Sequence, residues 1–405
     1  MKIRSITYFC DPKYPLDEGV IRGAGDFLAK ATAAYEAEGY EVQSTRLATI
    51  PFPKLLHRDE VDRLNELPRL AQQLEGLIRQ AGIPYASFGP ALPDHRASYG
   101  WIPEAIGATQ DVFFGGVMAD PVTGIDIGAV RACARVIVET APLDPNGFAN
   151  LRFAALANVA PGSPFFPAAY HEGGVPAFAI GTEAADLAVD AFTGASTIAE
   201  ARNALVSAID THGARLSQIA AQALADTRFG GIDFSLAPFP AEAVSLGTAL
   251  ERLGVPVVGE HGSLAAAAII TESVERARFP RVGFSGLMMP VLEDASLARH
   301  AALGSLTVKD LLLYSAVCGT GLDTIPLPGD TTADRMVPVL LDVCALALRL
   351  DKPLTARLMP VPGKRVGDET HFDFGFFANS KVMALESMPL AAPLANDQRF
   401  ALHKR

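Results

Sequence analysis

Short apolar segments that end in small and ionisable residues recur along this 405-residue chain. Three follow one another closely: GGIDFSLAPFP at 230–240, VPVVGEHGS at 255–263 and VCGTGLDTIPLPGD at 317–330. In each, an apolar or β-branched run stops at a glycine, and polar side chains gather at that point. Loops at the carboxyl ends of strands are where α/β and barrel folds build their sites. The pattern therefore predicts an enzyme-like cavity and names residues to line it, but no reaction.

The composition limits the classes of partner. Hydrophobic residues make up 49% of the chain, which is enough for a large core, and the formal charge is -11 with no Lys/Arg-rich stretch. We therefore expect no nucleic acid and no membrane surface as partner. No segment approaches the roughly 18 apolar residues of a membrane helix, and Asp11 and Pro12 interrupt the apolar start, which makes it a poor signal peptide.

The four cysteines are far apart and lack CxxC spacing, namely Cys10, Cys133, Cys318 and Cys344. This argues against a disulfide scaffold and a structural zinc site. Reduced thiols are the simplest interpretation, and we expect a cytoplasmic protein.

Strand and helix patterns alternate along the chain. Strands are predicted at 3–10, 40–50, 85–92, 111–119, 151–161, 176–183, 232–237, 255–260, 282–291, 355–361 and 371–378. Helices are predicted at 23–38, 61–80 (with a kink at Pro68), 124–139, 198–225, 241–253, from 264, 306–315 and 332–350. Alternation predicts an α/β fold with a parallel sheet and helices outside it. No linker divides the chain, so one large β/α barrel over residues 1–405 is favoured over two doubly wound domains.

Two His-Glu pairs are candidates for proton transfer. Glu260 and His261 lie between glycines, after the predicted strand 255–260 and before an Ala-rich helix. An imidazole there could shuttle a proton near neutral pH, although a turn histidine bonded to backbone carbonyls has the same pattern. His171 and Glu172 precede two glycines, which indicates either a loop that closes on a ligand or a solvated surface turn.

Asp233 and Ser235 alternate with apolar residues on the strand 232–237, so they share one face. A buried carboxylate there would need a partner, a metal or a substrate. The competing interpretation is a strand-end aspartate that caps a neighbouring turn.

The segment after Cys318 reads Gly319, Thr320, Gly321 and then Asp323. Its glycines would let backbone amides converge on a phosphate or carboxylate. Cys318 would need an activating histidine or cation to act as a nucleophile, and a lone cysteine is more often a small core residue. Asp323 is a further candidate catalytic group.

Ser285 completes the candidates for substrate binding. Glu293 and Asp294, with Asp233, would suit a divalent cation, but acids at a helix N-terminus have the same appearance. No early GxGxxG, Walker or HExxH motif is present, so we expect neither NAD nor ATP.

Five motifs in order resemble a bacterial and archaeal family of unknown function whose members are labelled "PFL family protein": NVAPGSPFFPAAYHEGG, GIDFSLAPFPA, GEHGSLAAAAI, GFSGLMMPVLED and CGTGLDTIPLPGD. The resemblance implies a ten-stranded β/α barrel similar to pyruvate formate-lyase and other glycyl radical enzymes. By this resemblance seven residues occupy motif positions of the family, namely His171, Asp233, Ser235, His261, Ser285, Cys318 and Asp323. It is most specific from Asn158 to Asp330 and names no site residue before Asn158.

The chain departs from the glycyl radical enzymes at two points. It lacks the Arg-Val-x-Gly-Tyr motif that carries the radical, the nearest stretch being FDFGFFANSK around Gly375, and it has no adjacent cysteine pair. The resemblance therefore implies no glycyl radical chemistry.

These observations favour a non-radical hydrolase or lyase that acts on a small polar, carboxylate-bearing metabolite. His261, oriented by Glu260, would be the general acid or base, with Asp233 and Asp323 as its partners or as ligands of a divalent metal. Residues 319–321 would hold the anionic group. The alternative is a non-catalytic metabolite-binding or regulatory protein with a degenerate barrel site, and a third, weaker alternative is a structural assembly protein. We expect a homo-oligomer.

Overall fold

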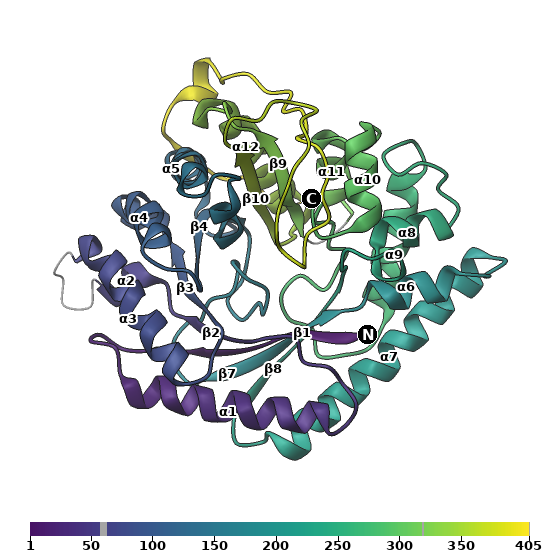
Figure 1. The fold of residues 1–405 in the computed structure, drawn as a ribbon, viewed down its shortest axis with the longest axis horizontal. Helices are drawn as coiled ribbons and strands as arrows, with labels where there is room; N and C mark the ends of the chain where they lie inside the picture. Colours follow the sequence, from purple (N-terminus) through teal and green to yellow (C-terminus); the bar gives the residue numbers. More distant parts are fainter. Residues whose placement is uncertain (57–62, 318–319, 405) are drawn as a thin grey trace.

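The protein is built around one large curved sheet, with helices at its periphery (Figure 1). The computed structural model describes residues 1–56, 63–317 and 320–404. Within these residues the strands are β1 (Lys2–Cys10), β2 (Thr45–Thr49), β3 (Tyr85–Ala91), β4 (Val112–Asp120), β5 (Gly124–Asp126), β6 (Phe153–Ala157), β7 (Ala177–Glu183), β8 (Arg228–Ala237), β9 (Gly321–Pro328), β10 (Leu354–Val361) and β11 (Arg399–Phe400). The predicted α/β class is confirmed.

The strand order is β8-β7-β1-β2-β3-β4-β6-β10-β9, and the short β5 and β11 extend from β4. Neighbours among β1, β2, β3, β4 and β6 are parallel, as are β7 with β8 and β9 with β10. The two sets meet in antiparallel pairs, β1 with β7 and β6 with β10. The strands β1, β2, β3, β4 and β6 therefore run in one direction, and β7, β8, β9 and β10 run in the opposite direction. Simple alternation of strands and helices did not predict this arrangement.

A closed ten-stranded barrel is not confirmed, because the continuous ladder of the described chain ends at β8 and β9. Residues 281–290 connect these two strands only through isolated parallel bridges, Ile232 with Arg281 and Pro290 with Asp323. The predicted strand at 282–291 is thus wrong as a regular strand. Ser285 has φ 42° and Gly283 has φ 66°, so this segment cannot stay extended.

Two further predicted strands are wrong. Residues 255–260 form turns, because the backbone packs closely at Gly259, where a Cβ atom would lie 1.9 Å from the Ser305 carbonyl oxygen. Residues 371–378 form a loop. In the 317–330 motif the sequence pattern predicts an apolar run that stops at a glycine, but the strand β9 begins at Gly321 and continues to Pro328. Thr320 and Asp323 therefore lie at the amino end of β9.

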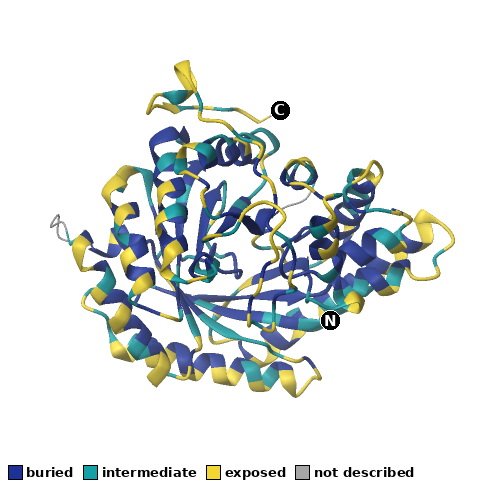
Figure 2. Cartoon of the chain, turned by 45° about the horizontal axis from the view of Figure 1, so that its top comes forward, coloured by how far each residue is buried: buried dark blue, intermediate teal, exposed yellow. Residues whose placement is uncertain are grey.

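The helices lie along the outer side of the sheet, and their exposed residues face away from it (Figure 2). The α-helices of the described chain are α1 (Glu18–Glu36), α2 (Phe52–Leu56), α3 (Leu67–Gln80), α4 (Ile102–Gly107), α5 (Ile127–Thr140), α6 (Ala185–Phe192), α7 (Ile198–Ala223), α8 (Leu246–Arg252), α9 (Ser263–Arg276), α10 (Ala295–Leu303), α11 (Val308–Ser315) and α12 (Ala333–Leu350). Its 3₁₀ helices are η1 (Leu64–Glu66), η2 (Pro93–Trp101), η3 (Ala141–Leu143), η4 (Phe148–Arg152), η5 (Glu242–Val244) and η6 (Ala392–Ala395). Pro68 lies in the first turn of α3, where the missing N–H would have no partner within the helix. Pro68 therefore marks the start of a helix and not the predicted kink.

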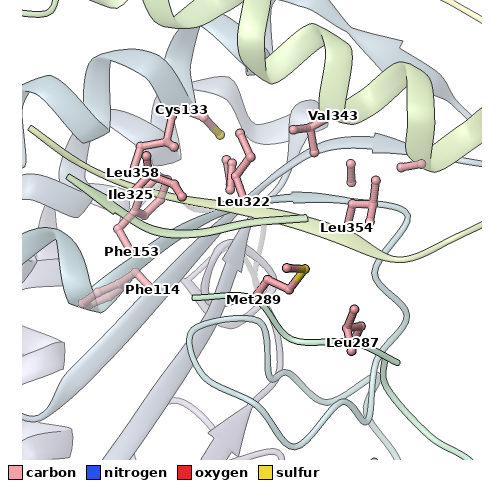
Figure 3. Packing of buried hydrophobic residues seen from close by; sticks show 14 of the residues in the cluster. Phe114, Cys133, Phe153, Leu287, Met289, Leu322, Ile325, Val343, Leu354 and Leu358 are labelled. Carbon is pink, nitrogen blue, oxygen red and sulfur yellow. The ribbon is translucent and has the colours of Figure 1, made fainter. Parts of the chain in front are cut away.

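The main core lies between the sheet and these helices. Figure 3 shows part of it, with Phe114, Phe153 and Leu358 from neighbouring strands close to Cys133 of α5. Successive residues of a strand face opposite sides, and β1 shows this clearly. Tyr8 packs on Phe27 of α1, with ring centroids 5.3 Å apart, whereas Thr7 faces the inner side.

The inner side of the sheet is filled by the loop between β6 and β7, residues 158–176. Thr7 Oγ1 donates a hydrogen bond to the Pro164 carbonyl at 2.8 Å, and Ser87 Oγ donates to the Ala169 carbonyl at 2.7 Å. A Cβ atom at Gly181 of β7 would lie 3.1 Å from the Phe165 ring. The loop is therefore packed directly on the strands, and it shapes the cavity described next.

Candidate functional site

A cavity of about 380 Å³ opens on the inner side of the sheet, within the size range of ligand sites. Its wall combines the first residues of several strands, the loop 158–176 and the C-terminal segment 371–377. Four charged residues of the wall, Arg4, Glu293, Asp323 and Arg357, form a connected network of ion pairs. Arg46, Asp111, Asp144 and Arg152 also line the cavity.

Arg357 of β10 is the centre of this network. Its Nε donates to Asp323 Oδ1 at 2.6 Å and its Nη2 donates to Asp323 Oδ2 at 3.0 Å, and Nη2 also donates to Glu293 Oε1 at 2.8 Å. All three residues are buried. Charge-assisted bidentate contacts of this kind fix both position and orientation.

Arg4 of β1 extends the network across the cavity to the strands β1 and β7. Its Nη2 donates to Glu293 Oε2 at 2.7 Å and its Nη1 donates to Glu183 Oε2 at 2.8 Å. Gln43 Nε2 donates to the same Glu183 oxygen at 2.8 Å. Glu293 thus joins two arginines that come from strands on either side of the cavity.

Irregular strand pairing aims both ion pairs at the cavity. Between the pairs Ala356–Leu322 and Leu358–Ile325, two residues of β9 (Asp323 and Thr324) oppose the single Arg357. Thr324 has φ 44°, an unusual conformation for a β-branched residue. In the pairing of β1 with β7, Arg4 is the extra residue between the pairs Ile3–Thr182 and Ser5–Gly181. Bulges re-aim side chains that regular alternation would direct elsewhere.

The electrostatics of the network favour a carboxyl that can hold a proton. Burial raises the pKa of Asp323, the charge of Arg357 opposes this rise, and Glu293 adds to it. Burial works against the charged form of Arg357, but Asp323 and Glu293 outweigh it and raise the pKa of the guanidinium. A carboxyl with a raised pKa beside a fixed cation is a candidate for proton transfer.

Arg46 of β2 also lines the cavity, but it is not part of this network. Among the residues that the structure describes, no carboxylate lies within ion-pair distance of it. Its Nε donates to Ser44 Oγ at 3.0 Å, and its guanidinium carbon lies 5.0 Å from the centre of the Phe166 ring. Burial, followed by the charge of Arg4, lowers the pKa of Arg46 to about 9, so it remains charged at neutral pH.

Aromatic side chains form a substantial part of the remaining wall. Tyr85 and Phe113 are 5.8 Å apart between ring centroids, and Phe113 and Phe166 are 5.3 Å apart. Across the cavity the C-terminal segment contributes Phe374 and Phe376, with the Arg4 guanidinium carbon 4.8 Å from the Phe376 ring centre.

Comparison with known proteins places this chain in a family. A family model described as uncharacterised ACR (DUF711) matches residues 1–379. The chain belongs to the DUF711 family. The resemblance to a family of unknown function is confirmed to that extent, whereas the likeness to pyruvate formate-lyase stays a prediction.

Relatives of this DUF711 chain occur in archaea and bacteria. It is 34% identical to a UPF0210 protein of Pyrobaculum aerophilum over 354 residues, which cover 83% of this chain and 77% of the relative. A UPF0210 protein of Listeria innocua is 28% identical over 400 residues, covering 94% and 88%. One of Neisseria meningitidis is 29% identical over 378 residues, covering 89% and 83%. These names state no activity.

Of the residues predicted from the sequence, Asp323 and Thr320 line the cavity of the DUF711 chain. The Thr320 hydroxyl is already used, because it donates to the Leu287 carbonyl at 2.9 Å. Gly321 has φ 91°, and a Cβ atom there would lie 2.2 Å from the Thr355 carbonyl oxygen. A glycine is therefore required at position 321 by the close packing of β9 on β10. Cys318 and Gly319 lie outside the described residues.

Asp233 is fully buried beside the cavity but does not line it. Its Oδ2 accepts from the Phe284 amide at 2.7 Å, and its Oδ1 accepts from the Ser285 amide and the Ser235 hydroxyl, both at 2.7 Å. The Ser285 hydroxyl in turn accepts from the Phe234 amide at 3.2 Å. The structure thus brings Asp233, Ser235 and Ser285 together, and they attach residues 281–286 to β8.

The two His-Glu pairs lie away from the cavity. Glu260 and His261 are exposed in the turn before α9. His171 is buried in the loop 158–176, its amide donates to the Thr49 carbonyl at 2.9 Å, and burial lowers the pKa of its imidazole. Glu172 is exposed and lies 3.8 Å from Arg228. The geometry gives these four residues no common site, and their predicted roles stay untested.

The described residues do not form the predicted cation site. Asp233 is occupied by backbone amides, and Asp294 caps α10 by accepting from the amides of Ser296 and Leu297. Within the described ranges no group of three or more His, Cys, Asp or Glu side chains is arranged to hold a metal ion. In the same part of the chain, no helix is long and apolar enough to cross a membrane.

The sequence interpretation missed Arg4, Arg46, Glu183 and Arg357, and it considered Glu293 only as a metal ligand. The signal was present, because Arg4 and Arg357 lie inside segments that the sequence predicts as, or next to, buried strands. Charged residues are almost never buried without a partner. A charge inside an apolar strand therefore predicts a second charge nearby, although the sequence does not say which one.

Proposed function

We propose that the cavity is the active site of a non-radical enzyme, of lyase or hydrolase type, that performs acid–base chemistry on a small carboxylate-bearing metabolite. The observation that carries the proposal is the network Asp323–Arg357–Glu293–Arg4 at the cavity wall. Ion networks with raised carboxyl pKa values in a cavity are typical of catalytic sites, although structural networks share this property.

In this proposal Asp323 is the proton-transfer group. Arg357 and Glu293 are positioning residues, since they fix Asp323 and set its pKa. The raised pKa makes the protonated form of Asp323 more accessible than in an ordinary aspartate, which suits an acid–base catalyst.

The hydroxyls of the cavity wall favour the lyase type. Ser44 Oγ donates to the Arg4 carbonyl at 2.7 Å, and Thr355 Oγ1 donates to the Thr320 carbonyl at 3.0 Å. The Thr320 hydroxyl donates to the Leu287 carbonyl. Each of these three hydroxyls, of Ser44, Thr320 and Thr355, therefore donates to a backbone carbonyl and not to a base that would activate it as a nucleophile. Proton abstraction beside a carboxylate requires only a base and a cation, and both are in place.

The alternative is a non-catalytic metabolite-binding or regulatory protein. One observation favours it, because both oxygens of Asp323 already accept hydrogen bonds from Arg357. A purely structural network would have this geometry too.

The experiment that separates these two functions uses Asp323→Asn. A thermal-shift screen of small carboxylates and amino-acid derivatives first identifies stabilising compounds, and NMR then follows each of them for turnover. Catalysis through Asp323 predicts that Asp323→Asn keeps the thermal shift and loses turnover. Asp342→Asn, which changes an exposed carboxylate of α12 outside this cavity, is the matched control. Turnover that survives in Asp323→Asn would refute the assignment, and stabilising compounds with no turnover in the wild type would favour the binding protein.

A ten-stranded barrel is part of the same proposal. Residues 281–290 would take the place of the tenth strand, and the fold would then resemble pyruvate formate-lyase. The support is that this segment bridges β8 and β9, both in parallel orientation. Cytoplasmic location and a homo-oligomer stay predictions.

A further inference from the structure

The arginines of the cavity differ in how their charge is balanced. Arg4 and Arg357 are held in ion pairs. Arg152 donates to the Thr109 carbonyl at 2.6 Å, and the acids near it (Asp144, Glu75 and Asp111) support its charge. For Arg46, the charges of Arg4 and Arg357 lower the pKa of the guanidinium, the charge of Glu293 raises it, and no ion pair forms within the described residues.

Arg46 also has unused hydrogen-bond donors. A guanidinium carries five N–H groups, and of these only Nε has a partner within the described chain, the Ser44 hydroxyl. Stacking on Phe166 holds the guanidinium plane against the cavity wall. The terminal nitrogens are therefore available to an acceptor in the cavity, and a planar fork of donors matches a carboxylate.

The surroundings of Arg46 are aromatic. Arg46 pairs with Tyr85 in the register of β2 and β3, and the contacts from Tyr85 through Phe113 to Phe166 form a continuous aromatic surface beside the guanidinium. The part of the ligand that extends from the carboxylate along this surface would contact the faces and edges of the aromatic rings. Flat apolar groups gain most from such contacts.

The remaining charges disfavour a second anionic group. Beside Arg46, three carboxylates (Glu183, Glu293 and Asp323) face two arginines (Arg4 and Arg357) in the network. The network is therefore negative by one charge when all groups are ionised. A dianion would place its second charge against this excess.

We propose that Arg46 binds the carboxylate of the ligand and that the cavity selects monocarboxylates carrying a flat apolar ring. A cavity of about 150 Å³ is enough for benzene, so the 380 Å³ here accommodate a ring together with its acid group. The proposal rests on the proposed function only in taking the cavity as the ligand site, and it does not require turnover.

Calorimetric titration of the full chain tests this inference with phenylacetate as the probe. The comparison compounds are acetate, which lacks the ring, phenylacetamide, which lacks the charge, and succinate, which carries a second carboxylate. We expect saturable binding of phenylacetate, with each comparison compound weaker by about tenfold or more. Equal binding of succinate, or no saturable binding of phenylacetate, would overturn the proposal.

The variant Arg46→Gln should weaken phenylacetate binding about tenfold or more, with Arg46→Lys between the two because it keeps the charge and loses the fork. Arg228→Gln, which removes an exposed arginine outside the cavity, should bind as the wild type does. Circular dichroism and thermal melting establish that each variant is folded, and Arg46→Lys serves as the test if Arg46→Gln is not. Unchanged binding in the folded Arg46 variants would refute the role of Arg46.

Failure here is distinguishable from failure of the proposed function. Phenylacetate binding that depends on Arg46 and persists in Asp323→Asn supports the inference even if no compound is turned over. Turnover of a small polar acid whose KM does not change in Arg46→Gln would overturn the inference and leave the proposed enzyme standing.

Discussion

Arg357 and Asp323 face each other across β10 and β9 in a bidentate ion pair, with Nε to Oδ1 at 2.6 Å and Nη2 to Oδ2 at 3.0 Å. Both residues are buried, and Glu293 shares the same guanidinium. The pair is formed where two residues of β9 oppose one of β10. One bulge thus sets the distance, the burial and the direction of the central charges of the cavity.

Removing the arginine of this pair should be costly. Arg357→Met leaves two buried carboxylates without their common cation, and we expect a loss of about 3–5 kcal/mol in the free energy of unfolding at pH 7. Urea unfolding measures it. The control is Arg299→Met, which removes an exposed arginine paired with Glu242 and Glu251 and should cost at most about 1 kcal/mol. Equal losses in the two variants would contradict this account of the network.

Asp233 should matter for stability more than for binding. Asp233→Ala leaves the buried amides of Phe284 and Ser285 and the Ser235 hydroxyl without their acceptor, so we expect a loss of about 3 kcal/mol or more. Because Phe284 lines the cavity, binding should weaken only as far as residues 281–286 shift. The measurement combines urea unfolding with titration of phenylacetate. Wild-type stability in Asp233→Ala would show that these hydrogen bonds are replaced by water.

Asp233 also predicts a pH dependence of stability. Burial raises its pKa from 3.8 to about 6. A raised carboxyl pKa means that the folded state binds the proton more tightly than the unfolded state does, so the stabilisation is present below about pH 4 and is lost as the pH rises through 6. The loss amounts to about 3 kcal/mol.

The test of this pH dependence is a difference between two proteins. Asp323 and Asp294 have raised pKa values as well, so the wild type alone cannot isolate Asp233. Urea unfolding of the wild type and of Asp233→Asn between pH 4 and pH 7 should show a steeper decline in the wild type. Parallel curves would mean that Asp233 is ionised throughout this range.

His261 gives a test between the sequence interpretation and the geometry. Its side chain is exposed and distant from the cavity wall, so His261→Ala should change the free energy of unfolding by less than about 0.5 kcal/mol. Turnover, wherever it is found, and phenylacetate binding should be unchanged. A variant that is folded but has lost turnover would restore the predicted role of His261 and remove Asp323 from the centre of the mechanism.

Much of the fold could be predicted from the sequence because regular elements leave periodic patterns. The helix predicted at 198–225 is found as α7, and the strand predicted at 232–237 lies within β8. The segments at 255–260 and 282–291 have strand-like composition, but close packing at Gly259 and the positive φ of Gly283 and Ser285 override it. Local propensity cannot reveal such contacts, because they are made by residues distant in the sequence.

The candidate site was harder to predict for a related physical reason. Glycine-flanked polar motifs indicate tight turns, and a tight turn can serve packing as well as binding, as Gly259 and Gly321 show. The cavity arginines that the sequence interpretation did not single out, among them Arg4, Arg46 and Arg357, instead lie within the strands β1, β2 and β10. Only the fold brings them together, and among the described residues Asp323 is the predicted catalytic residue that lies with them.

The loop 158–176 has a consequence for how relatives of this protein can diverge. The strands hold it through its backbone, since Thr7 and Ser87 donate to the carbonyls of Pro164 and Ala169. Phe165 and Phe166, by contrast, present their side chains to the cavity. Substitutions at Phe165 and Phe166 would reshape the pocket while the hydrogen bonds from Thr7 and Ser87 to the loop backbone are kept. Ligand preference can thus change at these two positions while the backbone hydrogen bonds that hold the loop on the sheet are kept.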